Sequence, residues 1–195
     1  MSTPDQAFIN LGEAKTVLDG LGIVFWLDGG TLLGAHRDAD FCADDHNDVD
    51  LSTWAANKHL IPDLISGMTA RGFRMYHHWS GDSRAPGMAQ EVSFTRNGLK
   101  IDVFFHERSG DVAWHCIYVA EVCRPVVVPL VLLAGFEPIM FRGVEFLRPA
   151  RIDEYLTFRY GDWRTPVHRS QYTSSDPAKF AALQPDWPFW EHCDG

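Results

Sequence analysis

Apolar side chains recur at helical spacing in several parts of the chain. The clearest run lies near the start, where the apolar positions are Ala7, Phe8, Leu11, Ala14, Val17 and Leu18. Pro4 before this run and Gly20 after it are typical of helix ends, so the pattern predicts a helix over residues 4–20. Similar patterns predict a helix over 56–70 and short helices over 31–37 and 152–160.

Shorter apolar runs, separated by turn residues, predict strands. They cover residues 23–27, 48–53, 73–78, 91–95, 100–105 and 111–119, with short strands and turns over 126–148. Asn97-Gly98 stands between two of these runs, and this dipeptide is a strong signal for a β-hairpin. The expected fold is therefore an α+β (mixed α/β) domain, with a mixed sheet flanked by helices.

Length and composition set the domain organisation. At 195 residues, with 46% hydrophobic and 22% charged residues, the chain has the size and composition of one globular domain. We expect a single domain over residues 1–167, with the Pro- and Trp-rich tail 168–195 packed on its surface. The formal net charge of −9 argues against a nucleic-acid partner, which would require clustered Lys and Arg.

The cysteines and the N-terminal segment bear on the compartment. Cys42, Cys116, Cys123 and Cys193 show neither CxxC pairing nor the density of a disulfide scaffold, so free thiols in a reducing compartment are expected. Residues 1–15 lack the pattern of a secretory signal. The most apolar run, 125–136, is shorter than the ~20 residues that span a bilayer. These features predict a cytoplasmic protein without a membrane span.

Two glycines begin the stretch that carries the candidate chemistry. Gly29 and Gly30 follow a strand and precede a helix, where backbone N–H groups can approach a phosphate and the helix end favours negative charge. Thr31 would either hydrogen-bond a phosphate or only cap the helix. Arg37, directly after the short helix, is expected to reach the phosphates. Further basic candidates, each more often an ordinary surface residue, are Arg74, Arg84, Arg96 and Lys100.

Three aspartates are the candidates for metal binding. Asp48 and Asp50 are two apart on a strand and share a face, where they can hold a divalent cation. The alternative is a solvent-facing edge. Asp102 argues against it, because a carboxylate within the apolar run 101–105 is costly to bury without a partner. If the two strands lie side by side, three carboxylates meet, and oxygen ligands favour Mg²⁺ or Mn²⁺ over zinc.

These motifs resemble the LicD/fukutin-type branch of the nucleotidyltransferase superfamily. Residues 29–37 and 48–51 are similar to the hallmark GG[ST]LLGxxR, followed by an acidic loop and D-[IV]-D-[IL]. Residues 141–146 and 154–166 resemble its FxG[IV]xF strand and YL…YGD…P ending. One departure lies in the acidic loop, where His46 stands in place of a usual acid and Asp45 is adjacent.

The resemblance implies a DNA-polymerase-β-like catalytic domain in which Asp48, Asp50 and Asp102 bind Mg²⁺. It also implies transfer of a phospho-substituent, such as phosphocholine or ribitol phosphate, from a CDP-activated donor to a glycan hydroxyl. Asp102 would additionally help to deprotonate that hydroxyl. Two alternatives stay open: transfer of a nucleotide from an NTP to a small hydroxylated molecule, and a catalytically inactive domain that only binds nucleotide or a partner protein.

Overall fold

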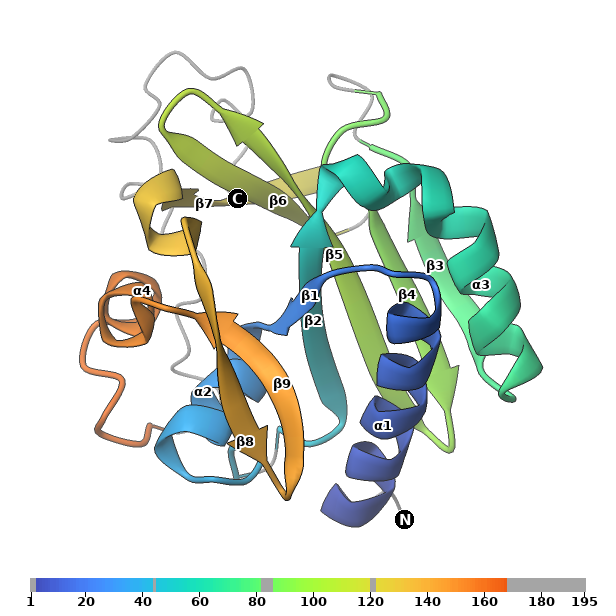
Figure 1. Ribbon diagram of the computed structural model, residues 1–195, viewed down its shortest axis with the longest axis horizontal. Coiled ribbons are helices and arrows are strands. Elements are labelled where there is room, and N and C mark those ends of the chain that lie inside the picture. Colours follow the sequence, from blue (N-terminus) through green and yellow to red (C-terminus); the bar gives the residue numbers. More distant parts are fainter. Residues whose placement is uncertain (1–2, 44, 82–85, 120–121, 168–195) are drawn as a thin grey trace.

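A mixed β-sheet with helices around it forms the body of the protein (Figure 1). The computed structural model describes residues 3–43, 45–81, 86–119 and 122–167. The strands are β1 Phe25–Leu27, β2 Asp48–Trp54, β3 Arg74–Trp79, β4 Glu91–Arg96, β5 Leu99–Ser109, β6 Val112–Val119, β7 Val122–Pro129, β8 Phe136–Phe141 and β9 Val144–Pro149. The first seven make one sheet, and β8–β9 form a separate hairpin. The predicted α+β class is confirmed.

The main sheet has the order β1-β2-β5-β4-β3, and β6 and β7 extend it from the end of β5. β2 and β5 run parallel, whereas the other pairs are antiparallel. On these two strands Val49, Leu51, Ile101 and Val103 are buried in the core. Because side chains alternate along a strand, the residues between them lie on the opposite face of the sheet. That face carries the candidate aspartates.

Helices α1 Pro4–Gly20 and α3 Ile61–Ala70 pack against each other and contribute to the same core (Figure 1). α1 has the predicted bounds, and the Thr3 hydroxyl caps it by accepting a hydrogen bond from the Gln6 N–H. The predicted helix 56–70 is divided into a 3₁₀ helix, η1 Ala55–Leu60, and α3. Pro62 explains the division, because proline is tolerated in the first turn of a helix and not in its interior.

The other two helices are α2, which carries the candidate glycines, and α4. α2 Gly29–Arg37 begins before the predicted position because Asp28 is its N-cap and accepts a hydrogen bond from the Gly29 N–H at 2.8 Å. The alternative in which Thr31 caps this helix was therefore wrong. α4 Ile152–Tyr160 has the predicted bounds, and a 3₁₀ turn, η2 Leu130–Leu133, joins β7 to β8. None of the described helices is long and apolar enough to cross a membrane.

The Asn-Gly hairpin is confirmed between β4 and β5. Arg96 pairs with Leu99, and the two residues between them have positive φ, 57° at Asn97 and 75° at Gly98. Two central residues with positive φ are the mark of a type I′ turn, whose twist matches that of paired strands. This hairpin fixes the register of β4 on β5 and therefore which β4 side chains face the aspartates.

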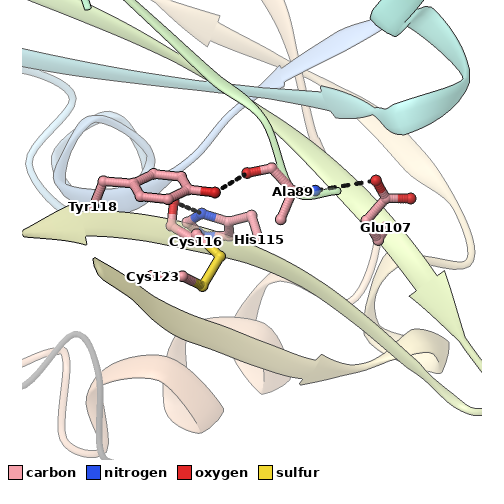
Figure 2. The surroundings of a disulfide bond; sticks show 6 residues. All are labelled: Ala89, Glu107, His115, Cys116, Tyr118 and Cys123. Atoms are coloured by element: carbon pink, nitrogen blue, oxygen red, sulfur yellow. Dashed lines mark hydrogen bonds between the residues drawn. A yellow bond between two sulfur atoms is a disulfide. The ribbon is translucent and has the colours of Figure 1, made fainter. Parts of the chain in front are cut away.

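The prediction of free thiols was wrong for two cysteines. Cys116 on β6 and Cys123 on β7 form a disulfide, with Cα atoms 5.1 Å apart (Figure 2). Tyr118 lies opposite Cys123 in this antiparallel pair, so the cysteines are diagonal neighbours on one face. Cys42 is buried and is not part of a disulfide among the described residues, and its thiol donates to the Gly30 carbonyl at 3.5 Å. Cys193 and the predicted tail packing over 168–195 lie outside the described residues.

Candidate functional site

Three carboxylates meet on the polar face of the sheet, where β2 runs beside β5. The parallel register sets Asp50 next to Asp102, and Asp48 next to Lys100. One carboxylate oxygen from each of Asp48, Asp50 and Asp102 lies within 4.8 Å of the other two. The side-by-side placement of these strands, expected from the sequence, is thus present. This pairing places Asp102 beside Asp48 and Asp50, from which it is far away in the sequence.

The carboxylates repel one another inside a partly enclosed space. Burial raises the pKa of Asp50 well above its usual range, and the charges of Asp48 and Asp102 raise it further. Burial also raises the pKa of Asp102, although Lys100 opposes that effect. Asp102 Oδ1 is buried and has no hydrogen-bond partner among the described residues. Such a set fits a divalent cation of the Mg²⁺ type, which binds carboxylate oxygens and stabilises their charged forms.

The first turn of α2 meets the cluster directly. The Gly30 N–H donates to Asp50 Oδ2 at 3.1 Å, and the Thr31 hydroxyl accepts from the Asp50 N–H at 3.0 Å. Gly29 has a φ of +54°, and a Cβ there would lie 2.0 Å from Asp50 Oδ2. Only glycine therefore lets the helix end approach so closely. Thr31 is buried, and its hydroxyl binds the backbone of β2 at Asp50.

A cleft of about 220 Å³ opens over the carboxylates. Besides the aspartates and glycines, the residues around it include Glu91, Lys100, Phe104, His115, Ile117, Tyr118, Arg159 and Tyr160. Figure 2 shows His115 and Tyr118 beside the disulfide that joins β6 to β7. The Tyr118 hydroxyl donates to the Ala89 carbonyl at 3.4 Å. The disulfide therefore braces the hairpin that forms one side of the cleft.

Comparison with known proteins decides the family. A family model described as LicD/FKTN/FKRP, nucleotidyltransferase domain, matches residues 22–151. The chain belongs to the LicD family. Relatives from Mus musculus and Homo sapiens, both named ribitol-5-phosphate transferase FKTN, are 28% identical over 184 residues. That match covers 91% of this chain and 37% of theirs, so the chain spans a little over a third of their length.

Two solved structures resemble the LicD domain at a distance. The solution structure of the antibiotic-resistance factor ANT(2″)-Ia aligns with a TM-score of 0.48 and 12% identity, covering 96% of this chain and 80% of that one. The crystal structure of ANT(2″)-Ia in complex with adenylyl-2″-tobramycin aligns with a TM-score of 0.43 and 16% identity, covering 93% and 91%.

The LicD domain has a buried anchor at the edge of the cleft that the sequence did not reveal. The Asp28 carboxylate, 1% exposed, accepts hydrogen bonds from the hydroxyls of Tyr155 at 2.6 Å and Ser52 at 2.7 Å. Burial would raise the pKa of Asp28, but Arg159 and His106 outweigh it and lower that pKa well below its usual range. Asp28 caps α2, so α4 is tied to the glycine pair. A usable signal was Tyr155, which belongs to the C-terminal family motif.

Arg37 does not join the LicD carboxylate cluster. Its guanidinium binds the Asp38 carboxylate at 2.7 and 2.8 Å and the Trp163 carbonyl at 3.2 Å, and it is not among the described residues around the cleft. Its contact with phosphate stays a prediction. Asp45 does reach the cleft, and a Cβ on Gly30 would lie 2.1 Å from its Oδ2. Arg84 lies outside the described residues.

Glu91 is a further carboxyl group of the cleft, and its place there was not predicted from the sequence. On β4 it pairs with Phe104, and Ser93 pairs with Asp102, so all four side chains share one face. Glu91 is 6% exposed and accepts a hydrogen bond from the Ser93 hydroxyl at 3.0 Å. Burial and the charge of Asp102 raise the pKa of Glu91 to about 8. Near neutral pH this group is therefore largely protonated.

Proposed function

We propose that this domain is a Mg²⁺-dependent (or Mn²⁺-dependent) transferase. It would move a phospho-substituent, such as a phosphocholine or polyol-phosphate group, from a CDP-activated donor to a hydroxyl acceptor such as a glycan. The observation that carries the proposal is the parallel pairing of β2 and β5, which gathers three carboxylates at the N-terminus of α2. The name ribitol-5-phosphate transferase, given to the fukutin relatives, supports the class of group transferred.

Each part of the site has a task in this reaction. The helix end at Gly29 and Gly30 would favour the diphosphate of the donor, because the helix dipole stabilises negative charge there. Asp48, Asp50 and Asp102 would hold the divalent ion. When bound, that ion would neutralise phosphate charge and orient the phosphoryl group for in-line displacement.

The chemical step is a single displacement at phosphorus. The acceptor hydroxyl oxygen forms a bond to the phosphorus of the transferred group, and the bond from that phosphorus to the bridging oxygen breaks. CMP leaves with the bridging oxygen, and the hydroxyl proton passes to the Asp102 carboxylate. Positioning and electrostatic stabilisation would supply most of the rate enhancement.

Product analysis tests this proposal against nucleotidyl transfer from an NTP. A panel of CDP-activated donors and NTPs is incubated with Mg²⁺ and candidate acceptors, and the released nucleotide is identified. CMP release with a modified acceptor supports the proposal, whereas pyrophosphate release with a nucleotidylated acceptor supports the alternative. Asp48→Asn should abolish turnover with the fold intact. Near-full activity of that variant would overturn the metal assignment.

A third hypothesis is a domain that binds nucleotide or a partner protein without catalysis, and the absence of turnover on every panel would favour it.

The cellular compartment is a separate question. The cytoplasmic prediction rested in part on free thiols, whereas disulfides persist mainly in oxidising compartments. Alkylation of the denatured chain in acid-quenched cells, without reductant, tests it: in a cytoplasmic protein Cys116 and Cys123 should be reduced and should react with the reagent.

A further inference from the structure

Lys100 lies within the carboxylate cluster. On β5 it stands two residues before Asp102 on the same face, and the parallel register sets it beside Asp48. Its Nζ is 2.7 Å from Asp102 Oδ2 and 3.1 Å from Asp48 Oδ1. Its side chain is 33% exposed. One ammonium group thus bridges one oxygen from each of two carboxylates, as a bound cation would.

We propose that Lys100 occupies one of the two cation positions of this cluster, so that the site binds a single divalent ion. The inference deepens the proposed function and rests on it. Mg²⁺ binds oxygen at about 2.0–2.1 Å, and the ions of a paired site stand about 3.5–4 Å apart. An ion bridging Asp48 Oδ1 and Asp102 Oδ2 would occupy nearly the same space as the Lys100 Nζ. The two cations would also repel each other there.

The remaining oxygens leave a place for one ion. Asp102 Oδ1 is buried and has no hydrogen-bond partner in the described part of the chain. Asp50 Oδ2 accepts a hydrogen bond from the Gly30 N–H and faces the end of α2. An ion held on this side would lie next to the position proposed for the donor phosphates. Lys100 would then hold Asp48 and Asp102 in line for that ion and supply a positive charge that needs no loading from solution.

Counting bound Mn²⁺ tests this assignment without measuring activity. Equilibrium dialysis with Mn²⁺ and excess CDP gives the ions bound per chain, and electron paramagnetic resonance detects a spin-coupled ion pair. The wild-type chain should bind one Mn²⁺ and show no coupled pair. Lys100→Met should bind two with a coupled signal, whereas Lys100→Arg, which keeps the charge, should bind one. Lys15→Met, which removes a lysine paired with Asp19 on the surface, should match the wild type.

Two bound ions in the wild type would overturn the inference, as would one ion in folded Lys100→Met. If Lys100→Met does not fold, Lys100→Gln replaces it, and the wild-type count still decides. These failures differ from a failure of the proposed function: if neither the wild type nor the Lys100 variants bind Mn²⁺, the metal assignment falls with the inference. A count of two in the wild type, or of one in folded Lys100→Met, leaves metal dependence intact and overturns only the role of Lys100.

Discussion

Reduction of the Cys116–Cys123 disulfide should lower the free energy of unfolding by about 2.4 kcal/mol, the loop-entropy value for a crosslink of this span. The cysteines are separated by 7 positions. Both are buried in a small cluster that also contains Trp114, Val126 and Val127. Backbone hydrogen bonds keep β6 and β7 paired after reduction. The stability is therefore lost mainly because the unfolded chain gains conformational freedom.

Urea denaturation followed by tryptophan fluorescence measures this effect with and without reductant. The control is the double variant Cys116→Ala/Cys123→Ala, whose hairpin has nothing to reduce. The wild-type midpoint should fall on addition of reductant, and the midpoint of the control should not move. An unchanged slope of unfolding free energy against urea would show that stability, rather than compactness of the unfolded state, had changed.

Two results would contradict this role of the disulfide. If reductant shifts the wild type and the double variant equally, the effect arises elsewhere in the chain. If the wild-type midpoint does not move and both thiols react with an alkylating agent under non-reducing denaturation, the crosslink does not form. In that case the side of the cleft formed by His115 and Tyr118 would depend on strand pairing alone.

Three further substitutions test the site and its support. Gly29→Ala places a Cβ against the Asp50 carboxylate, so Mn²⁺ affinity measured by calorimetry should fall roughly 10–100-fold; Gly12→Ala, where a Cβ meets open space, should leave it unchanged. The folded-state pKa of Glu91, about 8, lies above the ordinary 4.5, so the folded protein retains that proton and loses stability as pH rises between these values. In metal-free urea titrations, the free energy of unfolding of Glu91→Gln should therefore rise relative to that of the wild type, by up to a few kcal/mol, between pH 5 and pH 8. If the two free energies of unfolding changed in parallel with pH, this prediction would be contradicted. Arg159→Met leaves the Asp28 charge without its buried cation and should cost about 3 kcal/mol of unfolding free energy; a loss under ~1 kcal/mol would contradict the anchor.

Local signals in the sequence were sufficient for most elements near the site. The strand carrying Asp48 and Asp50, the turn at Asn97-Gly98 and the bounds of α1 and α4 each follow from periodicity, turn chemistry or end residues within a few positions. The meeting of the aspartates with Asp102 was a hypothesis that needed one tertiary assumption, the adjacency of two strands. The structure has that adjacency.

What the sequence missed depends on contacts between distant segments. The disulfide requires the pairing of β6 with β7, and the predicted strand started at residue 126, beyond Cys123. The anchor at Asp28 receives Tyr155 and Arg159 from the far end of the chain. Arg37, which was expected at the phosphates, stands at the end of α2 opposite the one that meets the carboxylates, and its contact with phosphate stays a prediction.

Lys100 shows a signal that was present and not used. It was weighed as one surface cation among several, although it shares a strand face with Asp102 by simple alternation. Its bridge to Asp48 then follows from the parallel register. Alternation along one strand could not place Glu91 in the same way, because its position beside the cluster depends on the hairpin register of β4 against β5.

Metal-dependent binding of CDP is the sharpest test of the proposed carboxylate metal site, because it needs no acceptor. The thermal midpoint is measured with CDP, with Mg²⁺ and with both, for the wild type and for Asp48→Asn. A ligand that binds only the native state raises its stability, so CDP and Mg²⁺ together should raise the wild-type midpoint by more than the two do separately. The excess should vanish in Asp48→Asn. No shift with any nucleotide, or an equal shift in the variant, would contradict the proposed metal-dependent nucleotide site.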